Sequence, residues 1–247
     1  MPKYTLLELV QKAARAIDSD EIASISDTPE SLDIAAIAED TFYELISKRD
    51  WPHLRTLVQG TASVTYPSYM GIPVRVREID SVRYNRKKTA GAVDLYEEII
   101  YLDPESFLDL QNNLNSSASN VTTATDPSGV TYNIRNDIAP SYYTSFDDEW
   151  LAFNSYNATL DNNLQSSKSQ IVVIRDPVWT SSDVFVPDLP IEAFPLLISE
   201  LIVNVGMVFN QEANAKEEQK AARQMRRMAG KSWTVERNIG IPYYGRK

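Results

Sequence analysis

Few side chains in this sequence could carry catalytic chemistry, and they form no familiar catalytic pattern. His53 is the single histidine and there is no cysteine, which excludes disulfides, thiolate metal sites and cysteine nucleophiles. A catalytic triad of serine, histidine and an acid needs a serine whose hydroxyl is exposed for attack. No serine here lies in the GxSxG turn that exposes it in many hydrolases. We therefore expect no catalytic residue, and a hydrolase that uses His53 is the weakest of the alternatives below.

Binding chemistry for metals and phosphates is equally sparse. Asp147, Asp148 and Glu149 form an acidic cluster that could hold a hard cation. They lie between two alternating apolar runs, where aspartates commonly form turns, and no EF-hand spacing follows them. The chain has only 8 glycines and neither a GxxxxGK[ST] nor a GxGxxG motif, which argues against a phosphate-binding loop. We predict no metal, no cofactor and no enzymatic activity.

Charge is distributed unevenly along the 247 residues, whose formal net charge is -10. Residues 216–247 carry nine lysines and arginines but three acids, so the rest of the chain has a net charge of -16. Such an acidic body repels nucleic acid, because stable binding depends on neutralising phosphates with lysine and arginine. The basic C-terminal part could bind an acidic protein surface or a nucleic acid.

Both ends of the chain have the 3.6-residue apolar period of helices. Residues 4–17 form an amphipathic pattern that is neither a signal peptide nor a membrane span, so we expect a cytoplasmic protein. A second helix should begin after Asp27 or Thr28 and end near Lys48 before Pro52. Its broad apolar side contrasts with a narrow polar side, which contains Asp33, Asp40, Glu44 and Ser47.

The middle of the chain changes to the two-residue period of strands. Strands are predicted in VREIDSVRY, EIIYL, YYTSF, LAFNSY and QIVVIR, with a short helix in ESFLDLQNNL. The DDEW sequence between YYTSF and LAFNSY predicts a hairpin. Residues 111–129 are rich in Asn, Ser and Thr, and we expect a long exposed, mobile loop there.

The C-terminal stretch is predicted to form two helices with distinct apolar and basic faces. One helical face of 191–209 is continuously apolar, and Leu196, Val203 and Met207 form a second, separate apolar strip. A helix of a single domain usually needs one such stripe, so the second strip predicts a contact with a neighbouring subunit. The following helix has a basic face, and Gly230 is expected to end it. The basic face consists of Lys216, Lys220, Arg223 and Arg227.

Residues 231–247 hold aromatic and aliphatic groups among basic ones, but too few to form a core. We predict an extended docking arm, in which the apolar groups bind pockets of a partner and charged groups form the rim. Its expected contact residues are Trp233, Arg237, Ile239, Ile241, Tyr243, Tyr244 and Arg246.

These patterns together predict an α+β fold. A helical bundle is expected from residues 1–60 and 187–230, a β-rich, sandwich-like or barrel-like insertion from 61–186, and the arm from 231–247.

Several segments, in their order and spacing, resemble the head-to-tail adaptors of short-tailed bacteriophages, the tail tubular protein A family. They span nearly the whole chain, apart from the Asn/Ser/Thr-rich run 111–129, which matches no motif of the family. The segments include TLLELVQKAARAI, SISDTPESLDIAAIAEDTFYELISKRDWPHL, VREIDSVRYN, EIIYLDPESFLDL, YYTSFDDEWLAFNSYNATLDNNLQSSKSQIVVIRDPVW, FVPDLPIEAFPLLISE, ANAKEEQKAARQMRRM and GIPYYGR.

The resemblance implies a structural protein of the virion tail or neck, assembled in the host cytoplasm. Such subunits form a dodecameric ring between the portal protein and the tail nozzle protein, around the channel for genome DNA. The C-terminal segment of the family docks onto the portal, which corresponds here to about 231–247. DNA would pass through without sequence-specific binding, and no membrane is involved. The main alternative is a nucleic-acid-binding protein that uses the basic C-terminal helix.

Overall fold

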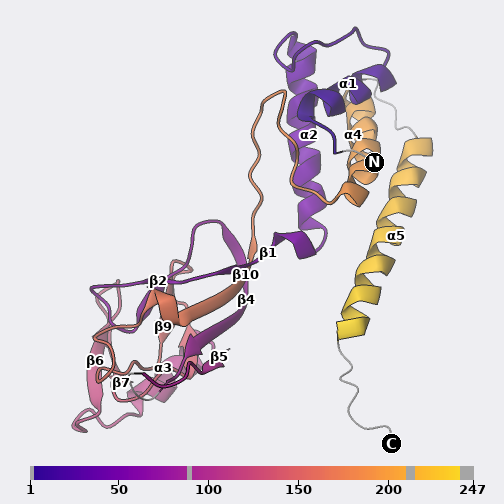
Figure 1. The fold of residues 1–247 in the computed structure, drawn as a ribbon. Helices are drawn as coiled ribbons and strands as arrows, with labels where there is room; N and C mark the ends of the chain where they lie inside the picture. Colours follow the sequence, from indigo (N-terminus) through magenta and orange to yellow (C-terminus); the bar gives the residue numbers. More distant parts are fainter. Residues whose placement is uncertain (1–2, 88–90, 210–214, 240–247) are drawn as a thin grey trace, which may run out of the picture. The chain divides into compact units, whose positions relative to one another are not determined.

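The computed structural model describes residues 3–87, 91–209 and 215–239, with side chains described up to Met228 in the last helix. The fold is α+β, and residue contacts divide it into two compact units. One unit combines the segments before Leu54 and after Asp176, and it holds the long helices (Figure 1). The other unit, 54–176, holds the strands. The divisions fall a few residues from the expected ones, because β1 already begins at Arg55.

Both N-terminal helices begin at threonine caps. Helix α1 (Leu6–Ala16) follows Thr5, whose hydroxyl accepts a bond from the Glu8 amide at 3.3 Å while the Glu8 carboxylate accepts one from the Thr5 amide at 2.8 Å. Helix α2 (Pro29–Ser47) has the same reciprocal arrangement between Thr28 and Ser31, so Thr28 is the cap of the two predicted candidates. These caps satisfy amides that lack partners within the first helical turn.

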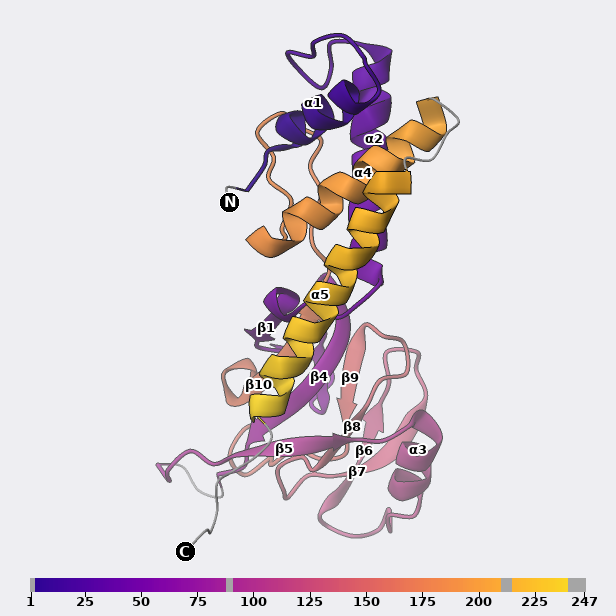
Figure 2. The ribbon, with the colours of Figure 1, turned by 90° about the vertical axis from the view of Figure 1, so that its right-hand side faces the viewer.

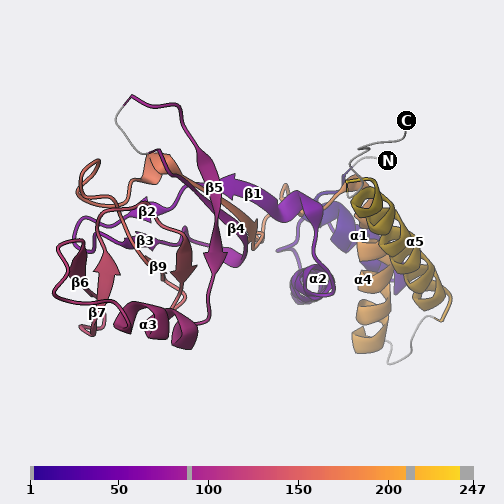
Figure 3. The ribbon, with the colours of Figure 1, turned by 90° about the horizontal axis from the view of Figure 1, so that it is seen from below.

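The helical unit is centred on α4 (Phe194–Phe209), which is preceded by a 3-10 turn, η3 (Ile191–Ala193). Helices α1 and α2 pack against α4, and α5 (Ala215–Ile239) packs against it as well. Figures 1 and 3 show α4 between α2 and α5. The stretch Ile191–Phe209 is long and apolar enough to cross a membrane, but half of it is buried inside the unit.

The chain that enters α4 is itself tied to the N-terminal helices. Carbonyl oxygens of Phe185 and Asp183 accept bonds from the Leu6 and Leu7 amides at 2.7 and 3.3 Å. The Asp183 carboxylate accepts bonds from the Ile25 amide and the Ser24 hydroxyl, both at 2.9 Å. These contacts, more than 150 residues apart in sequence, join the two ends of the chain into one unit.

The second unit is built on an eight-stranded sheet in the order β1-β10-β4-β5-β8-β9-β3-β2. All neighbouring pairs are antiparallel except β5 and β8. The predicted hairpin at DDEW is confirmed, because β8 pairs with β9 across it. The strands are β1 (Arg55–Val58), β2 (Thr61–Ala62), β3 (Tyr69–Gly71), β4 (Val76–Asn85), β5 (Tyr96–Tyr101), β8 (Tyr142–Thr144), β9 (Trp150–Phe153) and β10 (Ser169–Arg175). Short 3-10 turns, η1 (Pro52–Leu54) and η2 (Ser166–Lys168), precede β1 and β10.

The two strands at the ends of this sheet, β1 and β2, are consecutive in the chain. Gly60 lies between them, and its amide donates to the Ser169 hydroxyl at 2.9 Å. A Cβ at this position would lie 3.0 Å from Met70 Sδ and 3.2 Å from Ile171 Cδ1. A side chain at this position would require Met70 and Ile171 to shift, so glycine suits the point where the chain passes closely over the core between the two end strands.

The expected loop over 111–129 is wrong for part of its length. Helix α3 (Pro104–Asn112) occupies its start, and β6 (Val121–Thr125) pairs along its whole length with β7 (Thr131–Arg135). Ala124 is buried in a core with Phe107, and α3 lies beside the hairpin (Figure 2). Threonine-rich sequence suits a strand once a partner strand and a core face are present, which local composition does not reveal.

Candidate functional site

The side chain of His53 makes contacts that hold two segments of the helical unit together. Its Nε2 lies 2.9 Å from the carbonyl oxygen of Asp188, and its ring packs edge-on against Trp51 with 5.8 Å between centroids. Trp51 is buried and donates its indole N–H to the Leu45 carbonyl at 3.2 Å. The histidine therefore joins the end of α2 to the segment before α4.

The acidic cluster forms a turn, as its position between two strands suggested. Asp147 Oδ1 accepts bonds from the amides of Glu149 and Trp150 at 3.0 and 2.9 Å. Asp148 has a φ of 58°, the left-handed conformation that aspartate tolerates in turns. Within the described ranges, no three His, Cys, Asp or Glu side chains are grouped to hold a metal ion.

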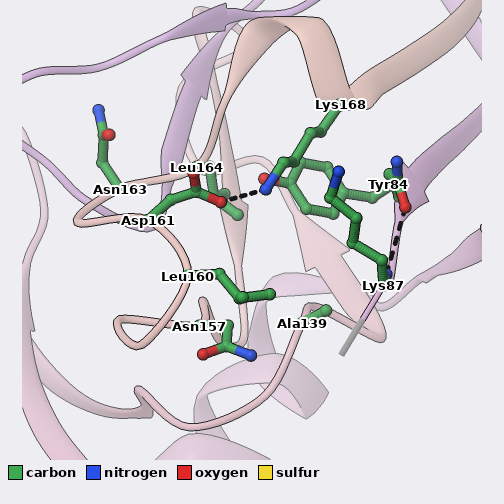
Figure 4. Close-up of a pocket in the computed structure, with 10 residues that line it drawn as sticks. Tyr84, Lys87, Ala139, Asn157, Leu160, Asp161, Asn163, Leu164 and Lys168 are labelled. Atoms are coloured by element: carbon green, nitrogen blue, oxygen red, sulfur yellow. Dashed lines mark hydrogen bonds and ion pairs between the residues drawn. The ribbon is translucent and has the colours of Figure 1, made fainter. Parts of the chain in front are cut away.

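A small hollow in the β unit is lined by charged and polar groups (Figure 4). Its volume of about 10 Å³ corresponds to a single water molecule, which excludes an organic ligand. Lys168 and Asp161 form an ion pair at its edge, and the Tyr84 hydroxyl accepts a bond from the Gln165 amide at 3.0 Å. Burial raises the pKa of Tyr84 to about 12, so its hydroxyl stays protonated near neutral pH. The arrangement fastens the chain around 157–168 to β4.

The predicted subunit strip on α4 is largely inside the chain. Leu196 and Val203 are 0% and 5% exposed, whereas Met207 is 49% exposed. Helix α5 packs on α4, and Glu217 of α5 lies close enough to Ser199 of α4 for the serine to lower the pKa of the carboxylate. Two-sided packing of α4 is thus provided by α1 and α2 on one side and by α5 of the same chain on the other.

The predicted basic face lies on the exposed side of α5. Lys216, Lys220, Arg223 and Arg227 are all exposed, and Ala221 is the buried residue of this part of the helix. Lys220 pairs with Glu217 at 3.0 Å within the helix. Burial opposes ionisation of Glu217, but the hydrogen bond from Lys220 holds its pKa below the ordinary value.

The expected end of this helix at Gly230 is wrong. Helix α5 continues to Ile239, so the part of the docking arm from 231 to 239 is helical rather than extended. A glycine inside a helix costs only about 1 kcal/mol relative to alanine, which flanking helix-forming residues offset. Trp233, Arg237 and Ile239 belong to this helix, and their side chains lie outside the described part. The other predicted arm residues, Ile241, Tyr243, Tyr244 and Arg246, also lie outside the described residues.

The predicted polar side of α2 also carries two exposed apolar residues that the sequence analysis did not identify. Leu32 and Tyr43 are 51% and 41% exposed, and they flank the exposed carboxylates of Asp33 and Asp40. The helical wheel already places both apolar residues off the buried side of α2, which is the signal that could have identified them.

Comparison of the chain with models of known protein families and with curated proteins gave no match. The resemblance to phage adaptors therefore rests on the segments quoted above and on their order.

Proposed function

We propose that the chain is a head-to-tail adaptor of a phage virion. In this proposal a homo-oligomeric ring, dodecameric in the family, joins the portal protein to the tail nozzle protein, and genome DNA passes through it. The observation that carries the proposal is the arrangement of the units, in which both ends of the chain form a helical unit around an inserted β unit. This is the arrangement that the resemblance implies.

The finer architecture belongs to the same proposal. Pairwise packing of α1, α2 and α4 supports a helical bundle, and the curled sheet with consecutive end strands supports a barrel-like insertion. The C-terminal residues after α5 would dock on the portal.

Negative-stain imaging of the full-length protein, alone and with the portal protein of the same phage, tests the proposal. We expect rings, and co-purification with portal that is lost when residues 240–247 are deleted. The deletion leaves α5 intact, so the melting temperature should change little. A protein that stays monomeric with portal present would contradict the proposal.

The second candidate is a nucleic-acid-binding protein, favoured by the four exposed basic residues on one side of α5. It predicts binding of DNA or RNA in fluorescence anisotropy at micromolar or lower concentrations. Because phosphate neutralisation releases counterions, that affinity should fall steeply between about 50 and 200 mM salt. An adaptor that only lets DNA pass should bind weakly throughout.

A further inference from the structure

The helical unit has two exposed faces of opposite charge. On α2, Asp33 and Asp40 are exposed, with no ion pair to another described residue, and Leu32 and Tyr43 lie beside them. We call these four residues the α2 face. Tyrosine is enriched in protein-binding surfaces, where it supplies contact area.

The basic face of α5 consists of Lys216, Lys220, Arg223 and Arg227. Two of its positive charges form no ion pair with a described residue. Lys220 pairs with Glu217, but no described carboxylate pairs with Arg223 or Arg227. Arginine favours protein interfaces, since its planar group binds carboxylates through two hydrogen bonds and stacks on aromatic rings.

The spacing of charge on the two faces matches. Asp33 and Asp40 are seven residues apart, as are Lys216 and Arg223, and Lys220 and Arg227. Seven residues of α-helix rise about 10.5 Å, close to two full turns, so each pair lies on one side of its helix. Two such helices placed side by side would bring both carboxylates opposite basic groups.

These faces do not meet within one chain. Helix α4 lies between α2 and α5, and the exposed face of α2 is opposite the buried residues that pack into the unit (Figures 1 and 3). Within one chain the two faces therefore cannot bind each other, whereas two copies can bring them together. A contact between different faces of identical copies is heterologous, and such contacts build closed rings or open filaments.

We propose that the α2 face of one copy binds the basic face of α5 of a second copy. This deepens the proposed ring and rests on the proposal that the chain assembles with itself. Charge complementarity favours the α2 face as the partner of the basic face of α5, because it offers carboxylates at the spacing of the basic groups. The chain outside 216–247 has a net charge of -16, which repels nucleic acid and disfavours it as the partner of the basic face.

Charge reversal of full-length protein tests the contact. One variant carries Asp33→Lys and Asp40→Lys. A second carries glutamate at all four positions of the basic face, Lys216→Glu, Lys220→Glu, Arg223→Glu and Arg227→Glu. A third carries all six changes. A matched control carries Glu78→Lys and Asp109→Lys, two exposed acids of the β unit. Sedimentation velocity at several salt concentrations measures assembly, and circular dichroism checks that each variant is folded.

Each of these first two variants should assemble at least about 100-fold more weakly than the wild type, because like charges then face each other across the contact. The control should assemble normally. An equimolar mixture of the first two variants should assemble again, since each contact between unlike copies pairs opposite charges. The six-fold variant should also assemble alone.

Normal assembly of both the Asp→Lys variant and the variant of the basic face would overturn the contact while leaving the adaptor proposal intact. Failure of both the mixture and the six-fold variant to assemble would also overturn it. If the variant of the basic face assembles normally but loses binding of duplex DNA in anisotropy, the basic face is a nucleic-acid surface instead. Charge-dependent assembly into open filaments would support the contact and contradict the closed ring of the proposed function.

Discussion

The hydroxyls of Tyr69 and Tyr132 connect the β6–β7 hairpin to the sheet of the β unit. Tyr132 donates to Tyr69 at 2.8 Å, and Tyr69 donates to the Asp126 carboxylate at 2.8 Å. Burial raises the pKa of both tyrosines, that of Tyr132 to about 12. The chain of bonds keeps two buried hydroxyls satisfied where an unpaired one would be costly.

We expect Tyr69→Phe to lower the free energy of unfolding by about 1–3 kcal/mol, because it leaves the Tyr132 hydroxyl without its acceptor in the core. Urea denaturation followed by circular dichroism measures the change. Tyr101→Phe is the matched control, because Tyr101 is 54% exposed and keeps its ring contact with Tyr143. Equal stability of the two variants would show that the bonds contribute little.

Alkaline pH should destabilise the protein through its buried tyrosines. A tyrosine ionises near pH 10 in the unfolded chain, whereas burial raises the pKa of Tyr84 to about 12 in the folded one. The unfolded state therefore binds fewer protons above pH 10, and stability falls as pH rises from about 10 towards 12. In urea titrations between pH 9 and 11, Tyr84→Phe should show a shallower loss than the wild type. An unchanged slope would contradict this assignment.

At the scale of elements, the turn from β1 to β2 depends on the absence of a side chain at Gly60. A Cβ there would meet Met70 and Ile171 at 3.0 and 3.2 Å, whereas one at Gly71 would find ordinary contacts at 3.7 Å. We expect Gly60→Ala to destabilise the protein by about 1–3 kcal/mol, as overpacking of a core does. Gly71→Ala should change stability much less in the same thermal melts, and a reversed order would contradict the prediction.

Helix α5 gives a second prediction at this scale. Because Gly230 lies inside the helix, Gly230→Ala should raise helix content and stabilise α5 by up to about 1 kcal/mol. Far-ultraviolet circular dichroism of the full-length protein measures the change. If the helix ended at this glycine in a left-handed conformation, alanine would instead lower helix content or stability.

At the scale of the whole molecule, the β unit is inserted into the helical one at neighbouring points. Arg55 of β1 pairs with Ile174 of β10, so the inserted segment begins and ends on adjacent strands. Its core clusters consist of its own residues. We therefore expect residues 54–176 to fold when expressed alone, with a cooperative thermal transition. If residues 54–176 expressed alone show no cooperative transition, the helical unit is needed for this fold.

The sequence by itself determined the features that depend on local periodicity and charge. The capped helices at the N-terminus, the apolar helix over 191–209, the strands of the middle segment and the exposed basic face of α5 all follow from side-chain order over a few turns. The same reasoning identified no catalytic residue, and His53 lies in a structural contact in the folded chain.

Only the tertiary structure decided which surfaces are covered. Leu196 and Val203 form a strip that the sequence assigns to a neighbouring subunit, but they are buried in the chain's own helical unit, where α5 packs on α4. Likewise, Val121–Thr125 becomes a strand because Thr131–Arg135 pairs with it and Phe107 packs below Ala124. These outcomes depend on partners beyond the local sequence window, and the free energy of pairing and burial then outweighs local preference.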